Sequence, residues 1–197
     1  MPNPVLRRVP RNEMTPRLQA EHDAALALRD DATLQQVGAN APELMAWYRD
    51  EFYAKLFYSG RVDVRSKELL RYRLSTAHGC AFCNKGNRVA AAKAGVTAEQ
   101  LLQILDENHA VFSARDRAVL LVAEQIVMTN LHGSMTPALH ALLKPHFDDA
   151  QIFELGMVAG ILTGMAKFIF VYDLVEKEAH CPIVPLHELD SAVTAGR

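Results

Sequence analysis

Apolar residues recur along most of the chain at the three- and four-residue spacing of helices, and no alternating apolar and polar run is long enough to indicate a strand. The pattern therefore predicts an all-α fold. Residues 41–57 form an aromatic-rich segment that Asn40 and Glu43 would open as a capping box. Its stripe predicts one buried helix face, made by Leu44, Trp47, Tyr48, Phe52 and Leu56.

Two further helices are predicted to meet at a turn that carries a close pair of cysteines. The first covers residues 65–78 and is interrupted by Gly79, and the second is alanine-rich and begins near Cys80. Gly95 suits the left-handed residue that ends such a helix. The cysteines Cys80 and Cys83 are thus predicted at a helix-turn-helix corner.

Later helix starts are marked by capping residues before apolar runs. These are Thr97 with Gln100, Ser113 with Asp116, and Thr136 before Pro137.

The most apolar run covers residues 152–174 and is long enough to cross a bilayer. It contains Glu154 and Lys167, which argue against a span. Gly156, Gly160 and Gly164 share one face of it and permit close helix approach. We therefore expect a central core or subunit-interface helix.

The chain of 197 residues carries a formal net charge of −2, so its composition fits one globular domain and gives no electrostatic reason to expect nucleic acid or an anionic membrane as partner. The polar, proline-containing start lacks the pattern of a signal peptide, so we expect a cytoplasmic protein. We divide the domain into an N-terminal helical lobe over residues 1–60, a core over 61–175 and a loose C-terminal tail over 176–197, which contains Pro182 and Pro185.

The spacing C-x-x-C allows three interpretations. A redox pair is one, because residues three apart share a helix face and two such thiols can form a disulfide. A zinc site is another, although only His180 and Cys181 are available to complete a ligand set with Cys80 and Cys83. Buried structural thiols are the third. By the helix dipole alone, Cys80 at the start of the helix would be the more acidic and more exposed cysteine.

The stretch "ELLRYRLSTAHGCAFCNKGNRVAAAKAGVT" places Glu68 twelve residues before Cys80. It resembles the core of the carboxymuconolactone decarboxylase superfamily, specifically the alkylhydroperoxidase AhpD-like branch, whose pattern is E-x11-C-x2-C-x3-H before an alanine-rich helix and a glycine. The resemblance covers about thirty residues in detail and implies an AhpD-like helical bundle.

The resemblance also implies an activity, a thiol peroxidase without cofactor or metal that acts on hydrogen peroxide or organic hydroperoxides. In the family the second cysteine, here Cys83, attacks the peroxide and the first, Cys80, resolves the intermediate. A carboxylate, here Glu68, would relay through residue 87 to the thiol. An external dithiol reductant and a homo-oligomer, whether trimer, hexamer or dimer, are implied as partners.

This sequence departs from the family at Asn87, which stands where the pattern has histidine. Asparagine can hold a hydrogen-bond network but cannot take up a proton near neutral pH. His78 is an alternative base or else a residue of a surface turn, and Arg71 is placed to hold Glu68 as an ion pair.

Aromatic and basic residues near the motif have both a structural and a functional interpretation. Phe82 suggests an apolar pocket wall. A set of arginines around the motif would attract an anionic substrate, although a solvated helix face explains most of them: Arg61, Arg65, Arg71, Arg73 and Arg88.

Two alternatives to the peroxidase are kept. One is a cofactor-free lactone decarboxylase or isomerase of the same superfamily, a branch that does not depend on a cysteine pair. The other is a non-catalytic, redox-responsive binding protein, which Asn87 would favour.

Overall fold

The computed structural model describes residues 1–183 and shows helices and no strand over that range, as the apolar spacing predicts. The helices are α1 (Pro16–Arg29), α2 (Thr33–Gly38), α3 (Pro42–Trp47), α4 (Val64–Ala77), α5 (Ala81–Lys93), α6 (Ala98–Leu102), α7 (Ala114–Ile126), α8 (Pro137–Leu143) and α9 (Asp149–Val171), with a 3₁₀ turn η1 (Arg11–Glu13) and a π-helical segment η2 (Tyr48–Phe57). The expected tail lies outside the described residues from position 184 onward.

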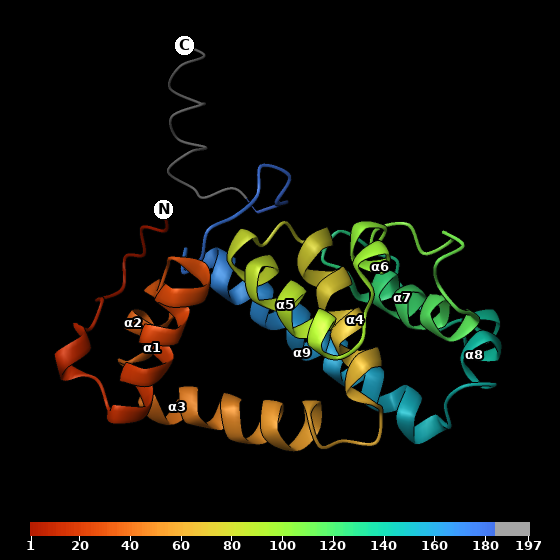
Figure 1. Ribbon diagram of the computed structural model, residues 1–197, viewed down its shortest axis with the longest axis horizontal. Helices are drawn as coiled ribbons and strands as arrows, with labels where there is room; N and C mark the ends of the chain where they lie inside the picture. Colours follow the sequence, from red (N-terminus) through yellow and green to blue (C-terminus); the bar gives the residue numbers. More distant parts are fainter. Residues whose placement is uncertain (184–197) are drawn as a thin grey trace, which may run out of the picture.

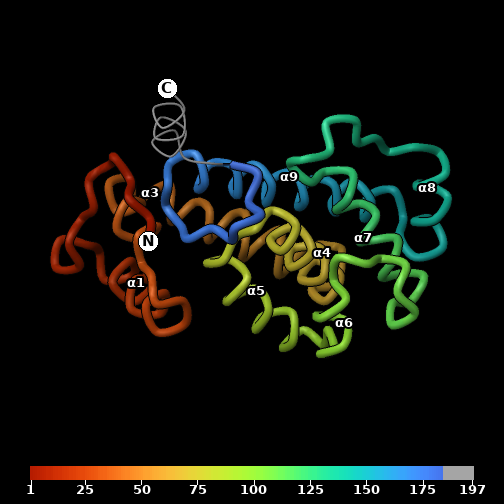
Figure 2. Tube along the Cα trace, turned by 90° about the horizontal axis from the view of Figure 1, so that it is seen from above, coloured from red at the N-terminus to blue at the C-terminus, as the bar shows by residue number. Residues whose placement is uncertain are grey.

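Helix α4 is the central element of the bundle and packs against α5, α7 and α9. Helices α1 and α2 form a lobe at one end of the elongated molecule, and α7 and α8 lie toward the other (Figure 2). Helix α3 and η2 run together along one edge and connect the lobe to α4 (Figure 1).

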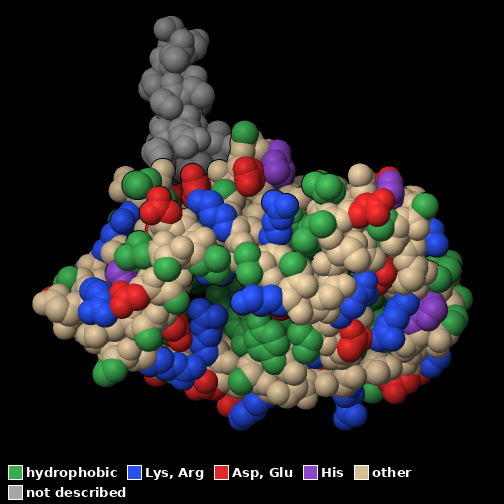
Figure 3. All heavy atoms as spheres, in the orientation of Figure 1, with side chains coloured by type: hydrophobic (Ala, Val, Ile, Leu, Met, Phe, Trp, Pro, Cys, Tyr) green, Lys and Arg blue, Asp and Glu red, His purple; other side chains and the backbone are tan. Residues whose placement is uncertain are grey.

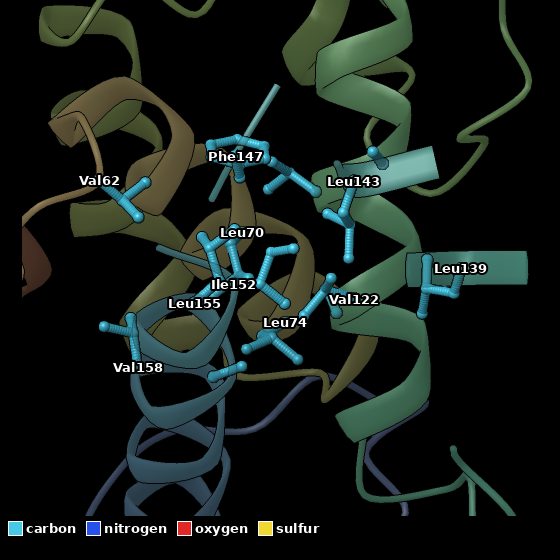
Figure 4. Packing of buried hydrophobic residues seen from close by; sticks show 14 of the residues in the cluster. Val62, Leu70, Leu74, Val122, Leu139, Leu143, Phe147, Ile152, Leu155 and Val158 are labelled. Carbon is cyan, nitrogen blue, oxygen red and sulfur yellow. The ribbon is translucent and has the colours of Figure 1, made fainter. Parts of the chain in front are cut away.

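The main apolar cluster joins α4, α7, α8 and α9 (Figure 4). Its labelled members are Val62, Leu70, Leu74, Val122, Leu139, Leu143, Phe147, Ile152, Leu155 and Val158. A second cluster contains Cys80 and Phe82 together with Phe170, Leu174 and Val175 at the end of α9. The cysteine corner therefore packs on its own apolar base rather than on the main core.

Most of the predicted helix starts are present. Both side chains of the capping boxes at Thr97 and Ser113 make their hydrogen bonds, and Thr136 accepts from the backbone of Leu139. The box predicted at Asn40 is wrong, because α3 begins after Ala41 and the Asn40 amide donates to two carbonyl groups instead. A local turn thus uses this side chain, as asparagine readily permits.

The aromatic stripe predicted for residues 41–57 is only partly correct. Leu44 and Trp47 are 63% and 57% exposed, whereas Phe52 and Phe57 are buried. Leu44 and Trp47 belong to α3, which has no buried residue, whereas Phe52 and Phe57 belong to the π-helical η2, where hydrogen bonds join residues five apart. A single α-helical stripe over residues 41–57 therefore does not describe both segments.

A buried ion pair joins α9 to α4. Lys67 is fully buried, and its Nζ lies 2.8 Å from Oε1 of Glu154. The Glu154 carboxylate also accepts hydrogen bonds from the backbone N–H groups of Arg61 and Val62. The acidic residue within the apolar run therefore anchors the turn that leads into α4.

Helix α9 is long and apolar enough to pass as a membrane span, with a mean hydropathy of 1.6, but only a third of that stretch is buried within the protein. One such helix is weak evidence for a membrane, and its Glu154 pairs with a buried lysine of α4. Part of the helix forms the core, and another face is open. There, a Cβ atom added at Gly156, Gly160 or Gly164 would meet no other atom within 4 Å.

Candidate redox site

The C-x-x-C pair lies at a sharp corner between α4 and α5, as predicted. Helix α4 ends at Ala77, His78 caps it, and Gly79 adopts a φ of +68° that reverses the chain. A side chain is strained in this left-handed region, so glycine suits the turn. Cys80 is the N-cap of α5, and its Sγ accepts the backbone N–H of Cys83 at 3.1 Å.

The two sulfur atoms are joined in a Cys80–Cys83 disulfide, so the structure represents the oxidised form of the pair. Cys80 is fully buried and Cys83 is partly exposed, and both line a pocket. The greater exposure expected of Cys80 from its position at the helix start is therefore wrong, because the turn and the end of α9 cover it. Of the two, Cys83 is therefore the more exposed cysteine.

The segment after α9 covers the corner, although a loose tail was expected there. Backbone hydrogen bonds join Glu176 O to Phe82 N–H at 3.3 Å and Glu178 N–H to Gly79 O at 2.7 Å. Cys181 packs so close that a Cβ atom at Gly79 would lie 2.9 Å from its Cα. Side-chain-free Gly79 thus permits the reversal and also the close approach of this segment. Pro185 lies outside the described residues.

A pocket of about 130 Å³ opens beside Cys83, lined by residues of α1, α2, η2, α4, α5 and α9. Figure 3 shows this face hollowed, with hydrophobic side chains in the hollow and basic side chains at its margin. Phe82, Leu162 and Ile169 are among the apolar residues of its wall, so Phe82 lies where the sequence suggested. An apolar site with a few polar groups is typical of small-molecule binding.

Glu68 lies behind the pocket wall rather than in it. Its Oε2 accepts a hydrogen bond from Nη2 of Arg71 at 2.6 Å, and its Oε1 lies 3.5 Å from the Tyr58 hydroxyl. Burial raises the pKa of Glu68, and the ion pair with Arg71 partly opposes that effect. The anticipated Glu68–Arg71 pair is therefore present.

Asn87 lines the pocket, as Cys83 does. Within residues 1–183 no hydrogen bond links its amide to Glu68, so the carboxylate-to-thiol relay inferred from the family pattern is not joined in this structure.

His78 is buried at the foot of the pocket, and its Nε2 accepts the backbone N–H of Met128 at 3.2 Å. Burial lowers the pKa of His78 to about 4. With its lone pair engaged and its neutral form favoured, the imidazole is arranged as a structural hydrogen-bond acceptor.

Most of the arginines that the sequence places around the motif do not line the pocket. Arg65 pairs with Asp116, and Arg73 pairs with glutamates and a backbone carbonyl. Of that set only Arg71 lines the pocket.

Several pocket residues that sequence reasoning did not single out come from the first 60 residues, among them Arg29, Gln35, Arg49 and Tyr53, whereas Tyr48 was expected mainly in the core. For the tyrosines a signal existed, because Tyr48, Tyr53 and Tyr58 are five apart, the spacing of a π-helical row. Their successive rings lie 5.1 and 6.0 Å apart.

The zinc interpretation finds no assembled site in the described part of the chain, where no three histidine, cysteine or acidic residues are grouped to hold a metal. His180 instead places its Nε2 3.0 Å from the carbonyl of Thr76.

Comparison with known proteins agrees with this fold. Residues 42–125 match the Carboxymuconolactone decarboxylase family. A Bacillus subtilis protein described as "Uncharacterized protein YdfG" is 28% identical over 121 residues, which is 60% of this chain and 79% of that protein.

Two solved structures match nearly the whole chain. The AhpD core of an uncharacterized peroxidase-related protein from Ralstonia eutropha JMP134 has a TM-score of 0.69 at 12% identity, over 91% of this chain and 94% of that one. A variant of the debrominase Bmp8, in complex with 2,3,4-tribromopyrrole, has a TM-score of 0.68 at 16% identity, over 96% and 97%.

The described chain therefore has an AhpD-like helical fold, with a cysteine pair at a helix-turn-helix corner. The family match over residues 42–125 and the shared fold support the carboxymuconolactone decarboxylase superfamily for this chain.

Proposed function

We propose that this protein is a thiol-dependent peroxidase that reduces hydrogen peroxide or an organic hydroperoxide through Cys83 and Cys80. The observation that carries the proposal is a cysteine pair close enough to form a disulfide, in which both cysteines line a pocket and Cys83 is the more exposed of the two. Likeness to the AhpD core of a peroxidase-related protein supports the same class of chemistry.

The chemistry balances with two thiols and one peroxide. The Cys83 thiolate attacks the outer peroxide oxygen, the O–O bond breaks, and the products are a sulfenic acid and, after protonation, an alcohol or water. Cys80 then attacks the Cys83 sulfur, so that water leaves and the disulfide forms. An external dithiol reduces that disulfide by exchange, which requires a reducing compartment such as the cytoplasm.

The thiolate in this scheme is favoured by fixed charge rather than by a base. Cys83 lies in the first turn of α5, where the positive end of the helix dipole is felt, and the guanidinium of Arg71 faces the same pocket. Asn87 is able to donate a hydrogen bond to the peroxide, but it cannot accept a proton.

A stopped-flow titration of the reduced protein with hydrogen peroxide and with cumene hydroperoxide tests the function. We expect one equivalent to be consumed at least about tenfold faster than by free cysteine, with mass spectrometry finding the Cys80–Cys83 disulfide as product. A rate no faster than that of a free thiol would count against the peroxidase. The redox-responsive binding protein would then be supported only if the oligomer size differs between oxidised and reduced protein.

A second candidate is reductive debromination by the same cysteine pair. It is favoured by the debrominase structure, which matches the whole pocket-forming chain, N-terminal lobe included. Bromide release from 2,3,4-tribromopyrrole by reduced protein, measured beside peroxide consumption, distinguishes the two.

We also propose that the open face of α9 packs against a second copy of the chain. Phe153 and Met157 are 70% and 46% exposed beside the open glycines, an apolar strip that water disfavours. The double change Phe153→Lys with Met157→Lys is expected to convert an oligomer into monomers in light-scattering measurements. Leu102→Lys, at an equally exposed leucine of α6, serves as the control. A monomeric wild-type protein, or an unchanged mass in the double variant, would refute this assembly.

A further inference from the structure

Three guanidinium groups line the pocket beside the cysteine pair, each from a different element. Arg29 ends α1, Arg49 belongs to η2 and Arg71 to α4. Among the described residues that line this pocket there is no aspartate or glutamate. The pocket wall therefore combines positively charged side chains with apolar ones.

The charges on the three arginines are unequally balanced. Arg71 forms its ion pair with Glu68 at 2.6 Å, and Arg49 lies 3.4 Å from Glu21. Arg29 has no carboxylate within ion-pairing distance in residues 1–183. One positive charge of the pocket is thus left without a partner.

Packing holds the Arg29 guanidinium over α5 close to the cysteines. It lies 4.9 Å from the ring centroid of Phe82, the neighbour of Cys83. It also crosses Gly86 so closely that a Cβ atom there would lie 2.0 Å from its Nη2. A planar guanidinium stacked on an aromatic ring keeps its N–H groups directed outward at its edge, which suits binding of a carboxylate.

Several donors at this wall are unused. The Nε atoms of Arg29 and Arg71 are buried and lack hydrogen-bond partners within the described chain. Burial lowers the pKa of Arg29, and the neighbouring charges of Arg49 and Arg71 lower it further. Arginine nevertheless stays charged, so the repulsion persists until an anion relieves it.

We propose that Arg29, assisted by Arg49 and Arg71, binds a carboxylate group of the substrate, so that the preferred hydroperoxide is a carboxylate-bearing organic one. Its hydrocarbon part would lie along Leu34, Leu162 and Ile169, and the peroxide group would face Cys83. The assignment of the substrate rests on the proposed peroxidase function. Binding of a carboxylate at Arg29 is independent of that function.

Binding to the oxidised protein tests the subsite without any turnover. Calorimetric titrations with hexanoate and with hexan-1-ol compare two ligands that have the same six-carbon length, one with a carboxylate and one with a neutral hydroxyl group. We expect hexanoate to bind at least about tenfold more tightly, and Arg29→Gln to remove that preference. Arg88→Gln, the same charge change at an exposed position of α5, is the matched control and should bind hexanoate as the wild type does.

A second variant moves the guanidinium without removing it. In Gly86→Ala the new methyl group occupies the place of the Arg29 Nη2, so hexanoate affinity is expected to fall about as far as in Arg29→Gln. Circular dichroism of each variant checks that it is folded. Equal binding of hexanoate and hexan-1-ol by the wild type, or wild-type hexanoate affinity in folded Arg29→Gln, overturns the subsite.

Kinetic measurements with two hydroperoxides test the proposed substrate class separately from the proposed peroxidase activity. For a short carboxylate-bearing hydroperoxide and its methyl ester, the ratio of kcat/KM values should favour the acid in the wild type and fall at least about tenfold in Arg29→Gln. An unchanged ratio overturns the assignment of the substrate. If hexanoate binds through Arg29 while neither hydroperoxide reacts, the carboxylate subsite is supported and the peroxidase function is refuted.

Discussion

Cys83→Ser is expected to lose rapid peroxide consumption, by at least about a thousandfold, because it removes the more exposed of the two cysteines that line the pocket. Cys80→Ser should behave differently. It keeps the attacking sulfur, so it should consume one equivalent of peroxide and stop as a sulfenic acid on Cys83. The two variants therefore differ in the first step and not only in turnover.

The measurement is stopped-flow peroxide consumption with dimedone trapping and mass spectrometry of the trapped cysteine. Cys181→Ser is the control, since Cys181 packs beside the corner but carries no role in the proposed chemistry. Fast consumption by Cys83→Ser with the trapped product on Cys80 would reverse the assigned roles. Consumption that is equally fast in both single variants and in the double cysteine variant would exclude the cysteine pair altogether.

Glu154→Leu should destabilise the fold by about 3 kcal/mol or more, because it leaves the ammonium group of Lys67 buried without its counter-charge. The same change removes the acceptor of the Arg61 and Val62 backbone N–H groups. Urea denaturation of the reduced protein measures the loss. The double variant Lys67→Met with Glu154→Leu should regain much of it, since no unpaired charge then remains in the interior.

An exposed pair provides the control for this effect. Lys55 lies 2.6 Å from Glu51, with both side chains largely in water, so Glu51→Gln should change stability by less than about 1 kcal/mol. A comparably small effect of Glu154→Leu would show that Lys67 is not dependent on its partner.

The Lys67–Glu154 ion pair should also make the stability of the fold depend on pH in the acid range. Burial alone would raise the pKa of Glu154, but the hydrogen bonds from Lys67 and from two backbone N–H groups outweigh it, and the pKa is lowered. The stabilisation is therefore complete above the ordinary carboxyl range and lost as the pH falls through the lowered pKa. Glu154→Leu should lack this part of the acid dependence.

Helix periodicity and capping residues determined much of this fold by themselves. Thr97, Ser113 and Thr136 mark helix starts because a side-chain oxygen satisfies a free N–H within the same turn, which is a local interaction. Gly79 and the cysteines define the corner for the same reason, since backbone reversal at a positive φ depends on the residue itself. The superfamily followed from that corner and from Glu68.

Tertiary structure decided which of these residues share a surface. Tyr48 and Tyr53, five apart in the π-helical η2, face the pocket, whereas Trp47 at the end of α3 does not line it. Arg71 engages Glu68 across one helical turn, and within residues 1–183 no hydrogen bond joins Glu68 to Asn87. Arg29, more than fifty residues from Cys83 along the chain, lies over Phe82 beside it only after α1 packs on α5.

The sequence by itself therefore determined the class of helices, the cysteine corner and the superfamily, because each depends on contacts within a turn or on a short pattern. Only the tertiary structure decided which cysteine is the more exposed, that Glu154 pairs with Lys67, and that three arginines face one cavity. Burial and charge proximity are set by segments distant in the chain, and no local period encodes them.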